Sequence, residues 1–126
     1  MTANRGPVLF AMAALAAIIG WQSLTVHYQY GGNPTGLFWI SPNMPVPAIL
    51  RGERFYLFKD IMGYDGQTFH LMAHDPWMHR GVYENMGDAG YRYQRIFVPA
   101  VAWLLAAGSD QWVHTTYFTL VDAFLS

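Results

Sequence analysis

The chain has 126 residues, of which 53% are hydrophobic, 17% aromatic and only 12% charged. The charged share is about half of the roughly 25% found in soluble domains, so the composition argues against an ordinary water-soluble globule. The formal net charge of -1 argues against a nucleic-acid partner, because such a partner calls for clustered Lys and Arg. No cysteine is present, which excludes disulfides, thiolate catalysis and iron–sulfur clusters.

The N-terminal segment carries the strongest pattern. Residues 7–26 contain no charged side chain. At about 1.5 Å per residue, a helix of this length spans the roughly 30 Å hydrocarbon core of a bilayer. Arg5 precedes the segment, and Trp21 and Tyr28 lie near its far end, where interfacial residues are expected. The alternative is a cleaved signal peptide, but no clear A-x-A site follows the apolar run. We therefore predict an uncleaved transmembrane helix over 7–26.

Residues 27–95 read as a loop with short surface helices. The prolines and glycines between 31 and 47 forbid a long helix there. Between Ala48 and Met62 apolar positions recur at helical spacing, which predicts an amphipathic segment on the membrane surface or packed on its own domain. A further helix is expected from Asp65, as its N-cap, to just before Pro76.

The last part of the chain, 96–126, is predicted to be a helical membrane segment, because residues 96–108 and 111–126 are largely apolar. The expected fold is therefore mostly α, a single membrane domain over 1–126. Arg5 makes the short N-terminal tail the cytoplasmic candidate. Charge bias counts little in a loop as long as 27–95, so it does not fix the orientation.

Three short motifs follow one another in the second half of the chain. Residues 63–67 read Gly-Tyr-Asp-Gly-Gln, residues 75–76 Asp-Pro, and residues 91–95 Tyr-Arg-Tyr-Gln-Arg before an apolar helix. This order and spacing resemble the N-terminal region of bacterial polytopic membrane glycosyltransferases of the GT-C type, related to the protein mannosyltransferases. The chain departs from the family pattern at His70 and Leu71, where Tyr and Arg are usual. The resemblance implies the bacterial inner membrane, a periplasmic loop over 27–95 and a polyprenyl-phosphate sugar as donor.

The resemblance also implies roles for five residues. Asp65 would be the catalytic base that takes a proton from the acceptor hydroxyl, whereas its residue type alone favours a helix N-cap. Arg92 and Arg95 share a face if their segment is helical, and Arg suits phosphate binding. The alternative is that both arginines anchor a helix end at lipid headgroups. Tyr64 and Gln67 would donate hydrogen bonds to sugar or to backbone.

The histidines allow a different interpretation. His70 and His74 are four residues apart on the expected helix, which could place two imidazoles on one metal ion, with His79 as a third ligand. No H-E-x-x-H motif is present, and we expect neither a metal nor another cofactor. His27 and His114 are expected at the membrane borders.

The sequence thus favours an N-terminal portion or relative of a GT-C transferase, inactive as this short chain because family members have many more transmembrane helices. The alternative is a non-catalytic accessory subunit of a membrane complex, with other membrane subunits packed against 96–126. A third interpretation is a periplasmic protein with a signal anchor.

Overall fold

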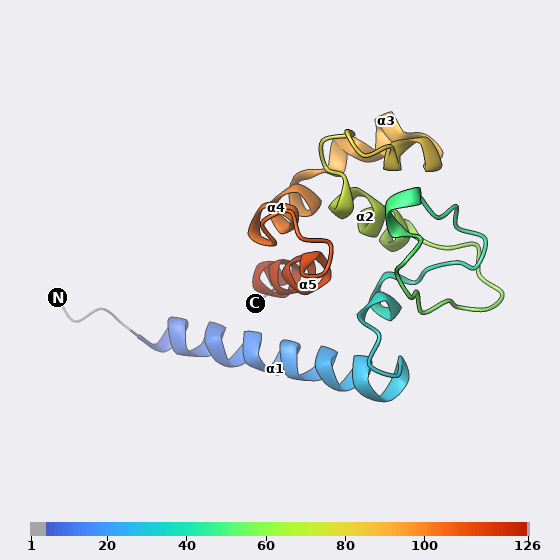
Figure 1. Cartoon of the computed structure of the whole chain (residues 1–126). Helices are drawn as coiled ribbons and strands as arrows, with labels where there is room; N and C mark the ends of the chain where they lie inside the picture. Colours follow the sequence, from blue (N-terminus) through green and yellow to red (C-terminus); the bar gives the residue numbers. More distant parts are fainter. Residues whose placement is uncertain (1–4, 126) are drawn as a thin grey trace.

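The computed structural model describes residues 5–125, and they form a mostly helical chain with one long apolar helix at the N-terminus. This helix, α1 (Gly6–Gln29), contains the predicted segment 7–26 and lies along one side of the remaining elements (Figure 1). Pro7 occupies its first turn, where the missing N–H costs nothing. No residue of α1 is buried. By length and composition, α1 is the one helix among residues 5–125 that could cross a membrane.

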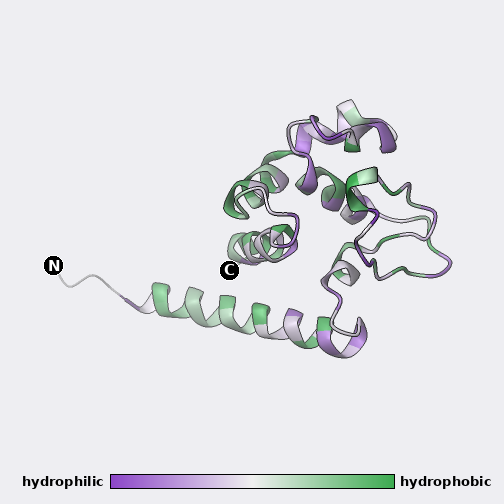
Figure 2. Ribbon diagram, in the orientation of Figure 1, coloured by the Kyte–Doolittle hydropathy of each residue, from purple (hydrophilic) through white to green (hydrophobic). Residues whose placement is uncertain are grey.

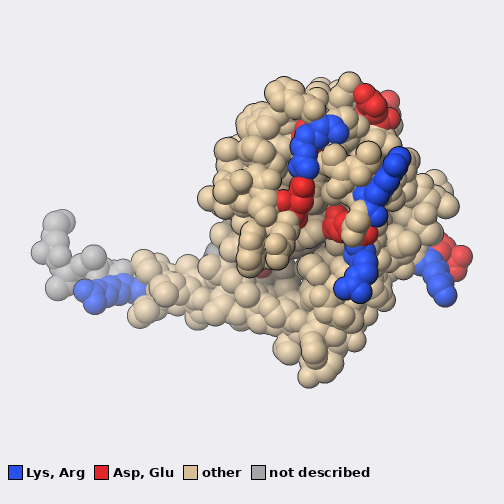
Figure 3. All heavy atoms as spheres, viewed as in Figure 1, with Lys and Arg blue, Asp and Glu red and all other residues tan. Residues whose placement is uncertain are grey.

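Polarity is distributed unevenly over the molecule. α1 is apolar along most of its length (Figure 2), and the charged side chains visible in Figure 3 lie over the other elements, apart from one at the start of α1. A helix that is apolar all round and exposed to its surroundings fits a lipid or protein environment better than water.

The segment after α1 is irregular. It contains two short 3-10 helices, η1 (Pro34–Phe38) and η2 (Ala48–Leu50), and an isolated bridge between Ile40 and Leu57. The prediction of an amphipathic helix between 48 and 62 is wrong, because only the three residues of η2 are helical there. The backbone N–H of Phe58 donates to the carbonyl of Ile40 at 3.0 Å instead of to its own segment. The apolar side chains of this segment pack on distant partners, and helical spacing alone does not reveal such partners.

Helix α2 (Asp65–His74) is the central element. Its last residues from His70 to His74 are all buried, and the helix ends just before Pro76 as predicted. Gly66 lies directly against η1: a Cβ added there would stand 2.5 Å from the carbonyl oxygen of Phe38. The second glycine of the Gly-Tyr-Asp-Gly-Gln motif is therefore required for close helix packing.

The chain then returns to α2 through three short helices, η3 (Val82–Asn85), α3 (Ala89–Arg92) and η4 (Tyr93–Arg95). Asp75 organises the turn before them: its carboxylate accepts backbone N–H groups of His79 at 2.8 Å, Arg80 at 2.9 Å and Val82 at 3.2 Å. The hydroxyl of Tyr93 donates to the carbonyl of Asp75 at 2.8 Å, and burial raises the pKa of Tyr93 to about 12. The Asp-Pro and Tyr-Arg-Tyr-Gln-Arg motifs are thus joined in space.

The predicted membrane segment 96–126 is helical but divided. It forms α4 (Phe97–Leu105) and α5 (Val113–Leu125), separated at Ala107 and Gly108, whose φ angles are 50° and 72°. The two helices pack together, and the hydroxyl of Thr116 donates to the carbonyl of Ala102 at 2.9 Å.

The amide of Gln22 in α1 donates to the carboxylate of Asp122 in α5. α5 also packs on α2. The core of the described residues draws on η1, η2, α2, η3, α4 and α5, and neither α1 nor α3 contributes a residue to it. Its most buried apolar residues include Phe38, Ile40, Leu71, Val82, Ala102 and Val113.

Candidate functional site

Helix α2 carries two separate groups of polar side chains. One group surrounds Asp65 at the N-terminal end of the helix, and the other surrounds His70 and His74 on its buried face. Two such groups on one ten-residue helix are positioned by the same packing against η1, α4 and α5.

Asp65 is the first residue of α2, and it is not the N-cap that its sequence position suggested. The residue before the helix is Tyr64, with extended backbone and no side-chain capping bond. Gly63, at a φ of 84°, turns the chain immediately before it. The helix begins one residue earlier than it would if Asp65 were the cap, and the Asp65 carboxylate is directed to other partners.

Those partners are the two arginines. Arg92 Nη1 lies 3.3 Å from Asp65 Oδ1, and Arg95 Nη1 lies 3.3 Å from Asp65 Oδ2. Arg92 also donates to the hydroxyl of Thr68 at 3.0 Å, and Arg95 donates to the hydroxyl of Tyr91 at 3.1 Å. The Asp65 side chain is 61% exposed, so these ion pairs lie at the surface. One carboxylate faces two guanidinium groups, which leaves this group of three side chains with an excess of positive charge.

A cavity of about 480 Å³ adjoins the N-terminal end of α2. Its lining includes Tyr64, Asp65, Gln67 and Arg92. Arg95 lines a smaller cavity that shares Asp65 and Arg92. Gln67 is partly committed to structure, because its side-chain oxygen accepts the backbone N–H of Ser41 at 3.1 Å. The five residues singled out from the sequence therefore gather at one place, and the arrangement can hold an anion beside a carboxylate.

The second group of polar side chains is buried. His70 and His74 are both 0% exposed, and His114 of α5 is 8% exposed. Their Nε2 atoms converge: His114 Nε2 lies 3.0 Å from that of His70 and 3.4 Å from that of His74. Glu53 completes the group, with its Oε1 2.9 Å from His114 Nε2 and 3.3 Å from His70 Nε2. We refer to Glu53, His70, His74 and His114 as the histidine cluster.

One histidine of the cluster has a defined orientation. Asp110 Oδ1 lies 2.7 Å from His74 Nδ1, and both Asp110 oxygens accept hydrogen bonds from Arg80, at 2.8 and 2.7 Å. Arg80 also donates to the carbonyl of His74 at 2.8 Å. The carboxylate fixes the proton of His74 on Nδ1, so that Nε2 presents a lone pair to the cluster.

Burial sets the protonation state of the cluster. Loss of hydration lowers the pKa of His70 to about 4 and also lowers that of His74, although Glu53 and Asp110 oppose the change. Burial alone would raise the pKa of Glu53, but hydrogen bonds from His114 and His70 outweigh it and hold the Glu53 pKa well below its usual range. At neutral pH His70 and His74 are therefore neutral and Glu53 is ionised. Glu53 Oε2 and His70 Nδ1 are buried without a hydrogen-bond partner.

The histidine cluster was only half visible in the sequence. The spacing of His70 and His74 identified two members, but His79, proposed as the third, is exposed and lies outside the cluster. His114 was expected at a membrane border and was not proposed as a ligand, and its imidazole is buried among the other cluster residues. Glu53 and His114 belong to segments that are distant from α2 in the sequence and lie beside it only in the folded chain. No local spacing signal pointed to either residue.

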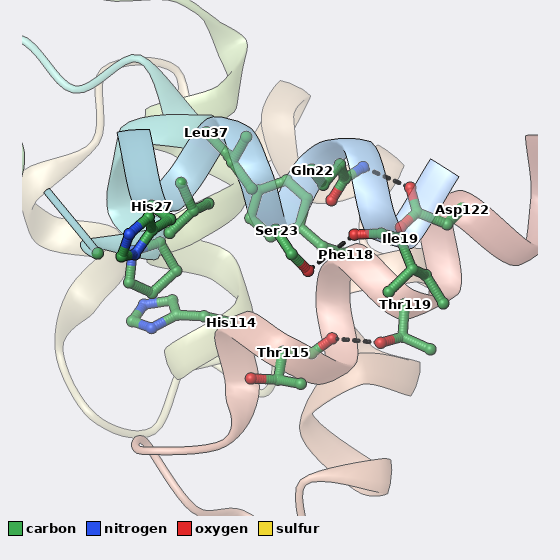
Figure 4. A pocket seen from close by; sticks show the side chains of 13 residues that line it. Ile19, Gln22, Ser23, His27, Leu37, His114, Thr115, Phe118, Thr119 and Asp122 are labelled. Carbon is green, nitrogen blue, oxygen red and sulfur yellow. Dashed lines mark hydrogen bonds between the residues drawn. The ribbon is translucent and has the colours of Figure 1, made fainter. Parts of the chain in front are cut away.

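Two open cavities reach the histidine cluster from outside. One of about 380 Å³ lies between α1 and α5, and His114 lines it together with His27 (Figure 4). The other, of about 580 Å³, is lined by Glu53, His114 and Tyr56 among others. The exposed edge of the cluster is therefore formed by Glu53 and His114.

Comparison of the chain with models of protein families, with curated proteins and with solved structures gave no match. Functional inference for this mostly helical chain with one long apolar helix therefore rests on its residues and their geometry.

Proposed function

We propose that the chain is an N-terminal part or a relative of a GT-C membrane glycosyltransferase that takes its sugar from a polyprenyl-phosphate donor. The single observation that supports this proposal is the contact of Asp65 with both Arg92 and Arg95, beside a cavity that Asp65 and Arg92 line. The base and the phosphate-binding groups of such a transferase have to flank the same reacting carbon, which requires them to lie this close.

In this proposal the two arginines bind the donor phosphate. A guanidinium group donates paired hydrogen bonds to phosphate oxygens and keeps its charge at any physiological pH. When the phosphate binds both arginines, it replaces the Asp65 carboxylate as their ion-pair partner. The freed carboxylate then accepts the proton of an acceptor hydroxyl as that oxygen attacks the sugar carbon and the phosphate leaves. Tyr64 and Gln67, on the wall of the same cavity, contribute hydrogen bonds to the sugar.

Binding of the donor can be tested on the chain alone, in nanodiscs that contain a polyprenyl phosphate. We expect saturable binding that weakens about 10-fold or more in Arg92→Gln and Arg95→Gln, since a hydrogen bond to a charged group contributes about 1.5–3 kcal/mol. Asp65→Asn should bind the phosphate at least as tightly as the wild type, because it removes the competing carboxylate. Arg51→Gln is the matched control: Arg51 is exposed and lies outside the Asp65 group.

Two results would contradict the proposal. One is equal binding to nanodiscs in which phosphatidylglycerol replaces the polyprenyl phosphate, which would reduce the site to headgroup attraction. The other is an equal loss of binding in Arg51→Gln. We expect no sugar transfer by the isolated chain, because donor and acceptor sites of this type are built from many helices and positioning supplies much of the rate.

A second candidate function, a non-catalytic subunit of a membrane complex, is favoured by the exposed apolar side chains of α4 and α5. Leu104 and Leu105 are 57% and 62% exposed, and Phe124 and Leu125 are 66% and 74% exposed. Such surfaces pack against lipid or against another membrane protein. Co-purification of a stoichiometric membrane partner, lost on replacement of Leu104 and Leu105 by Ser, together with no polyprenyl-phosphate binding, would favour this candidate over the transferase.

A further inference from the structure

We propose that the histidine cluster, Glu53, His70, His74 and His114, is a four-coordinate binding site for a divalent transition metal of the zinc class. The proposal is independent of the transferase: it concerns other side chains, and either proposal can fail without the other.

The geometry of the donor atoms carries the proposal. Zinc binds imidazole nitrogen and carboxylate oxygen at about 2.0–2.2 Å, so the edges of its coordination tetrahedron are about 3.3–3.6 Å long. The corresponding contacts of His114 Nε2 are 2.9 Å to Glu53, 3.0 Å to His70 and 3.4 Å to His74. One donor atom from each of the four residues lies within 4.8 Å of every other. A small cation at their centre needs the 2.9 and 3.0 Å contacts to lengthen and any separation near the 4.8 Å limit to shorten.

Hydrogen bonding among the four side chains is a poor substitute for a cation. Glu53 Oε1 can accept an N–H from both His70 and His114, but those two N–H groups then face each other across 3.0 Å. Glu53 Oε2 is buried with no hydrogen-bond partner, and its ion-pair contact with His74 Nε2 is 3.9 Å long. A buried acceptor without a partner costs about 1–3 kcal/mol, and bonding to a metal removes this cost for the carboxylate. Nδ1 of His70 stays unpaired in either state.

The surroundings of His74 support the same inference. The chain Arg80–Asp110–His74 holds the imidazole with Nδ1 toward the carboxylate and Nε2 toward the cluster. Metal-binding histidines regularly donate their second N–H to a carboxylate or carbonyl, which fixes the ring and raises its basicity.

The donor set also limits the kind of metal and its role. Three imidazole nitrogens and one carboxylate suit Zn²⁺ and neighbouring transition metals, whereas Ca²⁺ and Mg²⁺ take oxygen ligands. Four protein ligands leave no open position on a tetrahedral ion, which is typical of a structural site. The ligands come from the 51–62 loop (Glu53), α2 (His70 and His74) and α5 (His114), so the ion would join these three segments. Glu53 and His114, which line the 580 Å³ cavity, provide the entrance.

The test uses the full chain in detergent, purified through a tag without histidine and stripped with a chelator. Titration with Zn²⁺ should show one equivalent bound per chain, and Co²⁺ should give the intense visible spectrum of a four-coordinate ion. His114→Gln and Glu53→Gln should weaken Zn²⁺ binding about 100-fold or more, since each removes a ligand. His79→Gln and His27→Gln are matched controls, because both residues are exposed histidines outside the cluster.

Glu53→Gln keeps the shape of the side chain, so it tests the site even if His114→Gln fails to fold. Addition of Zn²⁺ should also raise the unfolding temperature of the wild type but not of Glu53→Gln. The proposal is overturned if the wild type binds less than about a tenth of an equivalent, or if the Co²⁺ spectrum is weak and six-coordinate. An equal loss of affinity in His79→Gln or His27→Gln would overturn it too.

Discussion

The Nε2 atoms of His70 and His114 lie 3.0 Å apart across 44 residues of sequence, and their imidazole rings are stacked within 10° of parallel. This contact joins α2, which lies in the middle of the chain, to α5, the last helix. It brings the second half of the chain together around α2, whereas α1 meets the same body along one side (Figure 1). Because Asp65, His70 and His74 all belong to α2, the position of this helix sets the position of both polar groups.

The two aspartates of the motifs should behave in opposite ways. Asp75→Asn should lower the free energy of unfolding by about 1–3 kcal/mol, because the buried carboxylate accepts three backbone N–H groups and an amide places an NH₂ against them. Asp65→Asn should change stability by less than about 1 kcal/mol, since its ion pairs lie at the surface. Chemical unfolding in detergent measures both. Equal effects would contradict the division into a structural and a functional aspartate.

Gly66→Ala tests the packing of α2 on η1. The added methyl group would stand 2.5 Å from the Phe38 carbonyl oxygen, so we expect a loss of about 1–3 kcal/mol from forced displacement of the backbone. Gly90→Ala is the control: it lies in α3 with nothing within 4 Å of its added Cβ. There alanine should leave stability unchanged or raise it by up to about 1 kcal/mol. Thermal unfolding of the two variants should shift in opposite directions or differ clearly in size.

Asp110→Asn tests the support of His74. The amide can no longer offer a full negative charge to Nδ1–H, so Zn²⁺ affinity should fall about 10–100-fold while the Co²⁺ spectrum keeps its four-coordinate form. Asp60→Asn serves as the control, as Asp60 is exposed and outside the cluster. Unchanged affinity in Asp110→Asn would show that Asp110 does not tune the metal ligand.

Gln22→Leu tests the attachment of α1 to the rest of the molecule. Asp122 is 1% exposed and accepts a hydrogen bond from Gln22, so removal of this donor should lower the unfolding temperature through a loss of about 1–3 kcal/mol. Ser23→Ala is the control on the same helix, because the Ser23 hydroxyl donates to Ile19 within α1 (Figure 4). A loss in Ser23→Ala as large as that in Gln22→Leu would mean that helix propensity, and not the contact with α5, decides the effect.

Local pattern was enough for several elements. The uncharged run 7–26 predicted α1, because an apolar sequence of that length has few alternatives to a helix. Pro76 fixed the end of α2, since proline offers no N–H and excludes the helical conformation before it. Asp65, Arg92 and Arg95 were singled out by a resemblance, and the structure brings them together.

The remaining features depend on contacts between distant segments. Helical spacing over 48–62 predicted a helix. Instead, the backbone N–H of Phe58 donates to the carbonyl of Ile40 and the Phe55 ring packs against His70, so most of the segment is not helical. The pair His70 and His74 was visible because four residues make one helical turn. Glu53 and His114 were not visible, because no period relates a loop residue to a residue on another helix. Local sequence pattern thus determined α1 and the end of α2, and only tertiary packing decided which side chains complete the histidine cluster.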